Sequence, residues 1–373
     1  MSAPRRLCVV NPFQHGGGAE FQIHCLLDML NPRSSYDVSY LARHIDPESR
    51  GSYRVVPIGN GGAAPRLGYL MDAIPLYAAL RSQAPDVIYQ RVAGGYTAVC
   101  AYYARRHRVP LIWHVAHDSD VTPQALTEGR NPIRPFIEKR SVEYAIRRAD
   151  YIVVQKQQQR DLLMKHYGRD ADLIVLNVHP VPNEVLDKSG PTRVLWIANL
   201  KRWKQPEVFV RLAAALSELR DVRFTMIGAS PDGAADAPWR AELLHAIAAT
   251  PNLDYAGHKS HAEVNELLAR SHLFVNTSLH EGFPNTFIQA WMRGVPVLSL
   301  HVDPDDVLSR QHLGARANSE PELIRLARDL LTDAERRVEM GARARAYAVA
   351  HHSIENAAPL LQLIGSCVAR VPR

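Results

Sequence analysis

The segment EGFPNTFIQ, which begins at Glu281, sets a lone carboxylate and a turn between two apolar runs of sequence. Gly282–Asn285 have the composition of a turn, and Pro284 suits the first turn of a helix because it has no N–H to leave unpaired. The free amides at such a helix N-terminus attract phosphate groups. Gln289 lies eight residues after Glu281, just over one turn into the predicted helix. A carboxylate and a second polar group at this place would bind the hydroxyls of a sugar and of a ribose.

A basic loop stands earlier in the same half of the chain. Lys201, Arg202 and Lys204 follow a predicted strand and lie next to a predicted helix N-terminus that begins at Pro206. Cationic donors beside free helix amides favour an anion, and a diphosphate is the expected guest. The alternative is a solvated basic loop with no ligand.

A glycine loop, Gly16-Gly17-Gly18, follows the first predicted strand and precedes the first predicted helix. Glycines at this place let a ligand approach the backbone amides at the helix N-terminus. The loop is not a P-loop because no Lys-Ser/Thr pair follows, and it is not a dinucleotide fingerprint because Phe21 occupies the third glycine position. A tight turn without a ligand is the other interpretation.

The segment WHVAHDSD contains His114, His117, Asp118 and Asp120, a composition that suggests a metal site. If the strand runs through His117, the two histidines face opposite sides of the sheet and cannot share a metal ion. The sequence offers no further His or Cys cluster to complete such a site, so we predict no metal. A histidine with an aspartate neighbour at the end of a strand is better interpreted as a group that contacts a sugar or phosphate. The alternative is a core histidine with its hydrogen bonds satisfied.

Alternating strands and helices are predicted to position these groups. Short apolar runs are followed by amphipathic segments throughout the chain, which is typical of βαβ units and a parallel sheet. The predicted strands cover residues 6–13, 37–43, 53–59, 86–92, 110–116, 151–155, 193–198, 223–228, 253–257, 272–278 and 295–300. The predicted helices cover residues 19–30, 74–83, 95–107, 206–219, 241–249 and 262–270, and helix dominates from Pro321 onward.

The alternation stops near residue 180, where three prolines and a glycine indicate a linker. We therefore predict an α/β protein of two doubly wound Rossmann-like domains. The first spans residues 1–185 and is completed by a C-terminal helix over 352–373, and the second spans 190–350. Ligands of such sheets bind at the carboxyl ends of strands, so the expected site lies in the cleft between the two domains.

The composition is that of an ordinary soluble protein. The first residues lack the long apolar run of a signal peptide, and no apolar stretch is long enough to span a bilayer. The four cysteines are scattered in apolar contexts, as expected for buried thiols in a cytoplasmic protein. A net charge of +6 suggests some attraction to anions, although it also simply aids solubility.

The element EGFPNTFIQA…GVPVL closely resembles the Glu-any-seven-Glu element of retaining, nucleotide-sugar-dependent glycosyltransferases of the GT-B fold, family four. Weaker resemblances lie at the expected places along nearly the whole chain. They are the GGAE loop from Gly17, the His117-Asp118 pair, the strand RADYIVVQ, and Lys204 at the position of the family's diphosphate-binding lysine. The resemblance implies two Rossmann-like domains that face each other across a cleft.

The resemblance also implies roles for individual residues. The amides of Gly17 and Gly18 and the side chain of Lys204 would hold the donor diphosphate, and Glu281 would contact the hydroxyls of the transferred sugar. His117 would lie near the reactive face of that sugar, which makes His117, Lys204 and Glu281 the expected catalytic set. The remaining expected donor-binding residues are Asn199, Arg202, Gly282, Phe283, Pro284, Asn285, Thr286 and Gln289.

The resemblance further implies retention of anomeric configuration by a front-face route, in which the leaving phosphate takes the acceptor's proton. No protein nucleophile, metal or cofactor is then expected, and catalysis rests on electrostatic stabilisation of the departing diphosphate.

Two positions depart from the family pattern. Asn199 stands where the family usually has an arginine, and Lys201 or Arg202 would have to supply that charge. Gln289 stands where the family has its second glutamate, so the charge-assisted bidentate grip on two hydroxyls is lost. We expect this change to tune donor binding and not to abolish activity.

A basic segment raises the question of a membrane. Arg140, Arg147 and Arg148 are near helical spacing, with Arg130, Arg134 and Lys139 before or among them. Such a face could rest on anionic lipid and would suit a lipid-linked acceptor. An ordinary solvated helix face is the favoured interpretation. Nucleic acid is not expected, since no recognised module or aromatic stripe accompanies the charge.

The sequence therefore predicts a cytoplasmic hexosyltransferase, in peripheral contact with the inner face of the membrane if the basic helix binds lipid. Its donor would be a UDP- or GDP-sugar, and its acceptor a glycan or lipid-linked molecule in cell-surface polysaccharide or glycoconjugate biosynthesis. The rivals are a GT-B epimerase, hydrolase or phosphorylase, and a catalytically inactive sugar-nucleotide-binding partner.

Overall fold

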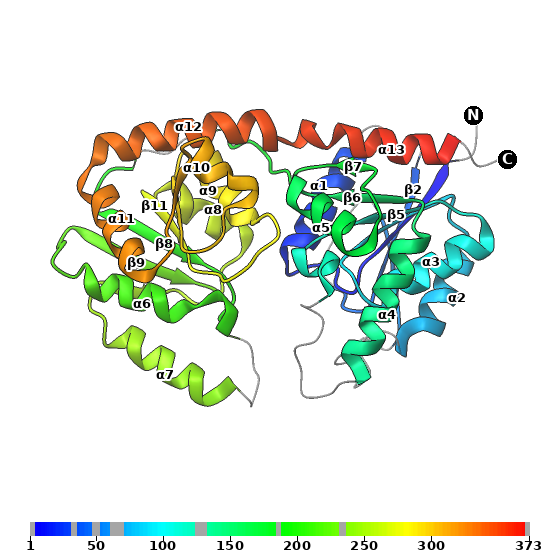
Figure 1. Ribbon diagram of the computed structural model, residues 1–373, viewed down its shortest axis with the longest axis horizontal. Helices are drawn as coiled ribbons and strands as arrows, with labels where there is room; N and C mark the ends of the chain where they lie inside the picture. The colour runs from blue at the N-terminus through cyan, green and yellow to red at the C-terminus, as the bar shows by residue number, and fades with distance from the viewer. Residues whose placement is uncertain are drawn as a thin grey trace. The chain divides into compact units, whose positions relative to one another are not determined.

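The computed structural model describes residues 4–30, 36–46, 53–59, 71–123, 133–183, 188–230 and 236–369. The chain divides into two compact units (Figure 1). Unit 1 comprises Met1–Val178 together with Ile354–Arg373, and unit 2 comprises His179–Ser353. The predicted bounds were 1–185 with 352–373 for the first domain and 190–350 for the second, whereas the units change at Val178/His179 and Ser353/Ile354.

Unit 1 is built on a parallel sheet with the strand order β3-β2-β1-β4-β5-β6-β7. Its strands are β1 (Arg5–Val10), β2 (Tyr36–Ala42), β3 (Arg54–Pro57), β4 (Val87–Arg91), β5 (Leu111–His114), β6 (Tyr151–Val154) and β7 (Leu173–Ile174). Its helices are α1 (Gly18–Leu30), α2 (Ala73–Gln83), α3 (Gly95–His107), α4 (Ile133–Arg148), α5 (Gln157–Tyr167) and α13 (Ala358–Ala369).

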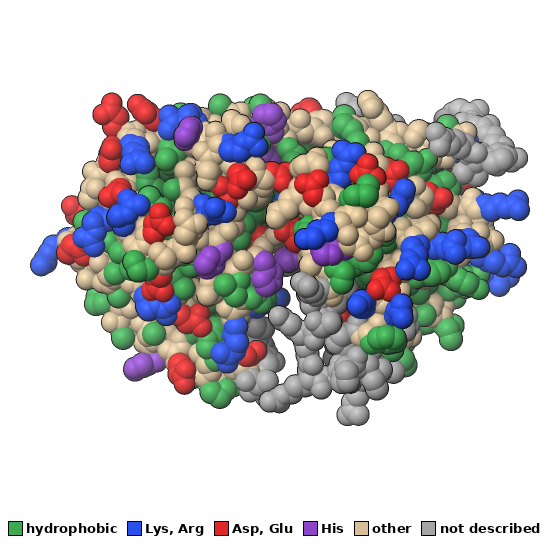
Figure 2. Space-filling model, viewed as in Figure 1, with side chains coloured by type: hydrophobic (Ala, Val, Ile, Leu, Met, Phe, Trp, Pro, Cys, Tyr) green, Lys and Arg blue, Asp and Glu red, His purple; other side chains and the backbone are tan. Residues whose placement is uncertain are grey.

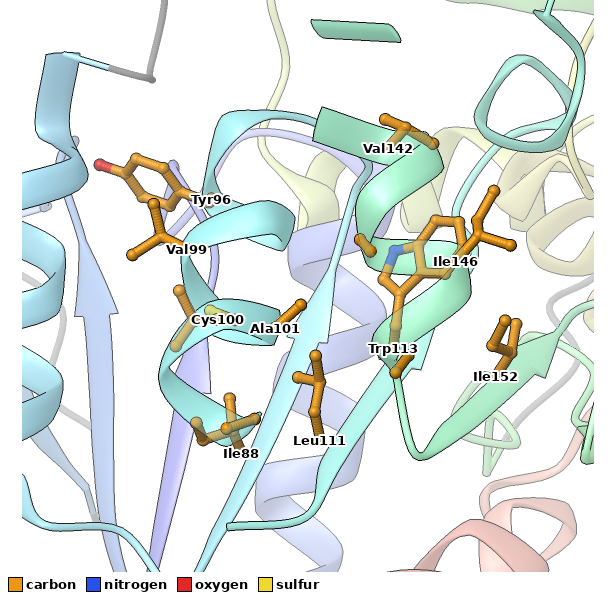
Figure 3. Packing of buried hydrophobic residues seen from close by; sticks show 14 of the residues in the cluster. Ile88, Tyr96, Val99, Cys100, Ala101, Leu111, Trp113, Val142, Ile146 and Ile152 are labelled. Atoms are coloured by element: carbon orange, nitrogen blue, oxygen red, sulfur yellow. The ribbon is translucent and has the colours of Figure 1, made fainter. Parts of the chain in front are cut away.

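The central strands of unit 1 are mostly buried because helices cover both faces of the sheet. Cys8 and Val10 of β1 point to one face, where they join a core formed with α2, α3 and α4. In Figure 3, Cys100 and Ala101 of α3 lie above Ile88 of β4. Alternation along β1 sends the next residues to the opposite face.

The opposite face of the sheet is covered by α1 and by the C-terminal helix α13, drawn in red in Figure 1. Leu360 and Ile364 of α13 are buried against Leu7 and Val9 of β1 and Ile23 of α1. This side of the first core is therefore completed by residues that lie about 350 positions along the chain from β1.

Unit 2 has a second parallel sheet with the strand order β10-β9-β8-β11-β12-β13. Its strands are β8 (Thr192–Ile197), β9 (Val222–Ile227), β10 (Leu253–Tyr255), β11 (Leu273–Asn276), β12 (Val297–Ser299) and β13 (Gly314–Arg316). Its helices are α6 (Pro206–Ala215), α7 (Ala237–Ala248), α8 (His261–Ala269), α9 (Asn285–Met292), α10 (Val307–Arg310), α11 (Glu320–Thr332) and α12 (Ala334–His352).

Local sequence explains several boundaries in unit 2. Pro206 stands in the first turn of α6, where its missing N–H leaves no hydrogen bond unmade. Ser260 caps α8 and Glu263 reaches back to it, a reciprocal capping box. Trp196 and Phe209 anchor the core between the sheet and α6.

Several predicted elements differ in detail from the structure. Strand β5 ends at His114 and does not continue to His117, because the chain then enters a short 3₁₀ turn over Asp118–Val121. The edge strands β7 and β13 are too short to give a sequence pattern, and both were missed. All four cysteines are buried and free, as expected. Within the described ranges, every helix is too short or too polar to span a lipid bilayer.

Candidate active site at the carboxyl edge of the second sheet

The order of the strands defines where unit 2 can bind a ligand. The chain passes from β8 outward to β9 and β10, while β11, on the other side of β8, continues outward to β12 and β13. The loops after β8 and β11 therefore separate at the point where the strand order reverses. In open α/β sheets, ligands bind in the crevice outside the carboxyl ends of strands at this switch point.

The basic loop after β8 and the EGFPN segment after β11 meet at this switch point. The Lys204 ammonium forms an ion pair with a carboxylate oxygen of Glu281. The Ser278 hydroxyl donates a hydrogen bond of 2.7 Å to the same oxygen. The two ionised side chains are only 15% and 12% exposed, so each is mostly withdrawn from water. Residues 77 positions apart thus form one polar centre.

Two opposing influences act on the charge of Lys204. Burial lowers the pKa of its ammonium, and the nearby Glu281 carboxylate raises it. The net effect lowers the pKa of Lys204, and the carboxylate offsets part of the cost of burying the ammonium. An ammonium has three donors, and an anionic ligand would compete with Glu281 for them.

Hydrogen bonds between the two loops fix this pair. The Thr277 hydroxyl donates to the Lys204 carbonyl at 2.6 Å and accepts from the Trp196 indole N–H at 2.8 Å. The Leu279 amide donates to the Trp203 carbonyl at 2.9 Å. Because Trp196 and Thr277 are buried, the positions of both loops are set by the core of unit 2.

An aromatic pair lies beside the ion pair. The rings of Trp203 and His280 are stacked, with centroids 5.1 Å apart and planes inclined by 9°. The Lys204 ammonium lies 4.0 Å from the centroid of the Trp203 ring, within range of a cation–π interaction. Sequence reasoning missed this stack, because nothing in the sequence shows that Trp203 and His280 come together.

The loop after β8 also passes close to the loop after β9. A Cβ at Gly228 would overlap the Ala198 carbonyl oxygen, so only glycine allows the two backbones to approach this closely. Asn199, which takes the place of the family's arginine, is exposed next to this contact.

Arg202 does not contribute to the described ion pair of this site. Its guanidinium pairs with Asp236 at 3.1 Å and lies over the Trp239 ring, 5.0 Å from the centroid. Trp239 is held in turn by a hydrogen bond from its indole N–H to Glu207. Lys204, and not Arg202, is therefore the cation paired with Glu281.

The turn after Glu281 leads directly into α9, with Pro284 at the N-cap and Asn285 and Thr286 in the first turn. The sequence placed Pro284 in the first turn of this helix, whereas it is the N-cap, so the first helical amide is that of Asn285. The Phe283 side chain is buried and contacts the rings of Trp291 and His352, with centroids 6.2 Å and 4.8 Å away. Its side chain anchors the turn, so only its backbone can serve a ligand.

Gln289 is buried on α9, and its amide N–H donates to the Asn265 side chain on α8 at 3.2 Å. None of the contacts described for Gln289 joins it to Lys204 or Glu281. Asn265 was not predicted as a site residue, and the spacing within either helix gives no signal for this pair.

Unit 1 carries the other predicted site residues. Its glycine loop packs against the buried side chain of Glu20. Gly18 begins α1, and Glu20 is buried beneath the loop, where it accepts a hydrogen bond of 2.7 Å from the Asn11 amide. A Cβ at Gly17 would overlap the Glu20 carboxylate. Burial raises the pKa of Glu20, and its hydrogen bonds partly offset that effect. The glycines thus leave room for a buried acid.

His117 lies in the loop after β5, where its ring Nδ1 accepts from the Ser119 amide at 3.1 Å. In the neutral ring, Nε2 therefore carries the proton. The neighbouring Asp118 pairs with the buried Lys156 at 2.9 Å and accepts from Gln159 at 3.0 Å. Both partners lie at the start of α5, so the loop that bears His117 is anchored to a helix.

His114 is a core residue. It is buried at the end of β5, its Nδ1 lies 2.8 Å from the Tyr89 hydroxyl, and burial together with Arg91 lowers its pKa. The two histidines of the WHVAHDSD segment therefore serve different purposes. Across the described part of the chain, no group of three or more His, Cys, Asp or Glu side chains is arranged to hold a metal ion.

Two protein-family models match the chain. The model described as "Glycosyl transferases group 1" matches residues 191–333, and the model described as "Glycosyltransferase Family 4" matches residues 16–182. A D-inositol 3-phosphate glycosyltransferase of Streptomyces bingchenggensis is 26% identical over 223 residues, which are 53% of this chain and 48% of that protein. The match thus spans about half the length of this curated relative.

Solved structures share the fold across nearly the whole chain. Sucrose-phosphate synthase from Thermosynechococcus elongatus superposes with a TM-score of 0.78 at 16% identity, covering 98% of this chain and 100% of that one. HepE from Anabaena, in complex with UDP-glucose, gives a TM-score of 0.74 at 17% identity, covering 97% and 99%. At such low identity these likenesses establish the fold alone.

Proposed function

Because the chain belongs to the group 1 and family 4 glycosyltransferases and has the GT-B fold, we propose that it is a retaining hexosyltransferase that uses a nucleoside-diphosphate sugar. The acceptor would be a glycan or a lipid-linked molecule in the synthesis of a cell-surface polysaccharide or glycoconjugate. UDP-sugars are the first donors to test, since HepE, which shares the fold, is described in complex with UDP-glucose. GDP-sugars are the second.

The Lys204–Glu281 pair at the switch point of unit 2 is the observation that carries this proposal. A cation and a carboxylate side by side match the two halves of a sugar diphosphate. The ammonium would bind phosphate oxygens, and the carboxylate would accept hydrogen bonds from sugar hydroxyls. The backbone amides of the turn at Gly282 and Phe283 and of the first turn of α9 at Asn285 and Thr286 would add donors to the phosphate and the sugar.

The proposed chemistry needs charge stabilisation more than a nucleophile. When the bond between the sugar and the diphosphate breaks, negative charge develops on the leaving phosphate. Lys204, held in place by hydrogen bonds and mostly withdrawn from water, would stabilise that charge. The leaving phosphate would then accept the acceptor's proton on the same face of the sugar, without a metal or other cofactor.

Three further roles remain proposals. Gln289, with Asn265, would bind the ribose through side-chain amides. The glycine loop of unit 1, at Gly17 and Gly18, would offer amides to the diphosphate. His117 would contact the transferred sugar, with its Nε2–H as the donor when the ring is neutral.

A calorimetric titration with UDP, GDP, ADP and their glucose and N-acetylglucosamine derivatives tests the donor site. We expect one nucleoside diphosphate and its sugars to bind, and the Lys204→Met protein to lose that binding. If none of these compounds binds the wild-type protein, the proposed donor site is wrong.

A second assay separates a transferase from its rivals. Release of free nucleotide only when an acceptor is present supports transfer. Release without an acceptor would indicate a hydrolase or epimerase, and binding without turnover across donors and acceptors would indicate a sugar-nucleotide-binding partner.

A further inference from the structure

An apolar groove lies on unit 1 between α2, α3 and α4. It has a volume of about 530 Å³ and is lined by Ile74 and Tyr77 of α2, Val99 and Tyr102 of α3, and Tyr144 of α4, with Arg81 at one end. This volume falls within the roughly 300–1,000 Å³ typical of small-ligand pockets. The proposed donor chemistry uses none of these residues.

Ile74 and Tyr102, which line the groove, project into water, and other exposed apolar side chains belong to or adjoin the same helices. Ile74 is 83% exposed, Met71 just before α2 is 58% exposed, and Tyr102 is 56% exposed. The exposed Phe136 belongs to α4, which packs beside α3. Large apolar side chains gathered on one surface mark an interaction site more often than single exposed residues do.

Basic side chains outnumber acidic ones on the three helices around the groove, and the acidic ones, Glu138 and Glu143, both belong to α4. Helices α2 and α3 contain Arg81, Arg105 and Arg106 and not one Asp or Glu. All three arginines are exposed, and none of them takes part in an ion pair with a described residue. Figure 2 shows basic side chains next to hydrophobic ones over the region of unit 1 that contains α2, α3 and α4.

The topology gathers these arginines at one end of the groove. Helix α2 leads into β4 and α3 leads into β5, and the two strands are parallel neighbours. Both helices therefore run antiparallel to their strands, and their C-terminal ends lie at the same edge of the sheet. Arg81 follows Ile74 and Tyr77 along α2, and Arg105 and Arg106 follow Tyr102 by three and four residues along α3, which keeps them on the groove side.

From this arrangement we propose that the groove and its arginines form a docking surface for an anionic lipid bilayer. A lipid hydrocarbon chain would occupy the groove between Tyr77, Tyr102 and Tyr144, and the lipid phosphates would bind Arg81, Arg105 and Arg106. Apolar insertion combined with basic charge is what holds interfacial helices on anionic membranes. The partly exposed tyrosines have the amphipathic rings that favour the membrane–water interface.

The sequence named the basic face of α4 as the candidate lipid contact, with an ordinary solvated face as the favoured interpretation, and this inference places the contact on α2 and α3 instead. Arg140 of α4 is engaged by Glu143 at 3.1 Å and lies over the Phe136 ring. Arg130 and the side chain of Arg134 lie outside the described residues. The surface does not depend on the sugar, base or acceptor of the transfer reaction.

Sedimentation of the full-length protein with vesicles tests the proposal. We expect vesicles of phosphatidylglycerol and phosphatidylcholine in equal parts to bind the protein, and pure phosphatidylcholine to bind it much less. The Arg105→Gln/Arg106→Gln protein should lose about 30-fold in partitioning, from about 1 kcal/mol for each basic residue near an anionic surface. Arg310→Gln/Arg316→Gln, which removes two exposed arginines from unit 2, is the matched control.

The apolar part is tested separately with Ile74→Glu, whose high exposure makes the change tolerable for folding. It should lose vesicle binding, whereas Val338→Glu, on α12 and 71% exposed, should keep it. Binding of UDP, measured alongside, reports folding and the donor site, so a failed donor proposal stays distinguishable from a failed docking surface. The proposal is overturned if the wild-type protein does not bind anionic vesicles, or if a variant of the groove binds them as well as its matched control does. It is also overturned if the wild-type chain is a dimer that Ile74→Glu dissociates.

Discussion

The two units have the same kind of switch point but place their charged groups differently around it. In unit 1 the polar residues at the ends of β1 and β4 are turned inward: Glu20 is 7% exposed beneath the glycine loop and Arg91 is 2% exposed, bonded to Asn177. In unit 2 the corresponding groups are Lys204, in the loop after β8, and Glu281, in the loop after β11, and these two residues form an ion pair with each other. The switch point of unit 1 stabilises its own loops, and at the switch point of unit 2 the proposed ligand would compete with the internal ion pair.

The difference has a physical origin in the loops. After β1, residues 11–17 end in a glycine turn without a helical turn of their own, and Glu20 in the first turn of α1 falls under that glycine turn. After β8, the chain makes a 3₁₀ turn over Arg202–Lys204 before α6, which lifts Lys204 toward the loop after β11. Two similar sheets thus serve different purposes through a few residues at the strand ends.

The largest expected effect is that of Lys204→Met on donor binding. A hydrogen bond to a charged group contributes about 1.5–3 kcal/mol, so the Kd for the nucleoside diphosphate should rise by about 10- to 150-fold. Arg202→Met, in the same turn, should change the Kd by less than about threefold, because its guanidinium is engaged by Asp236. Equal losses by calorimetry would show that the loop acts as a diffuse basic patch.

Glu281→Gln should have opposite effects on two ligands. In the variant the Lys204 ammonium has no ion pair within the protein that a phosphate must displace. A bare nucleoside diphosphate should therefore bind a few times more tightly. The nucleotide sugar should lose the added affinity that its sugar provides, by about tenfold. The ratio of the two Kd values is the measurement, and an unchanged ratio removes Glu281 from the sugar site.

Gln289→Glu should produce a smaller change that depends on the ribose hydroxyls. The Asn265 amide can turn to donate to the new carboxylate, so the fold should tolerate the substitution. A carboxylate grips hydroxyls more strongly than an amide does, and UDP should bind about three- to tenfold more tightly. A 2′,3′-dideoxy analogue should show no gain. An equal response of both ligands would mean that residue 289 does not contact the ribose.

Glu20→Gln tests the buried switch point of unit 1. Its effect on donor binding should be the smallest of these variants, and its measurable effect is on how the free energy of unfolding depends on pH. Burial raises the pKa of Glu20 above its unfolded value, so the folded protein binds more protons than the unfolded chain between those two values. Wild type should therefore lose stability relative to Glu20→Gln as the pH rises through that window. Urea unfolding between pH 5 and pH 8 measures the difference in the free energy of unfolding between wild type and Glu20→Gln. If wild type becomes more stable relative to the variant as the pH rises, the prediction is wrong.

Much of the fold could be predicted from the sequence because strands and helices leave local patterns. Helix α3 was predicted at its observed bounds. Three prolines and a glycine in the sequence predicted the linker near residue 180. The predicted EGFPN turn leads into α9, since its signal is contained in consecutive residues.

The partners of the site residues could not be predicted in the same way. The Arg202–Asp236 pair, the Trp203–His280 stack and the Gln289–Asn265 hydrogen bond all join segments that are brought together only by the fold. The sequence showed which side chains stand near strand ends. It did not show which of them are engaged by a neighbour.

The C-terminal helix α13 has a consequence for how the protein folds during synthesis. When residue 178 has left the ribosome, Leu360 and Ile364 have not yet been synthesised. The apolar side chains on the face of the unit 1 sheet that α13 later covers are therefore still exposed to water. Unit 2, which is continuous in sequence, can complete its core first. The first half of the chain must wait for the last helix, and during that interval its exposed face is the part of the nascent protein most dependent on a chaperone.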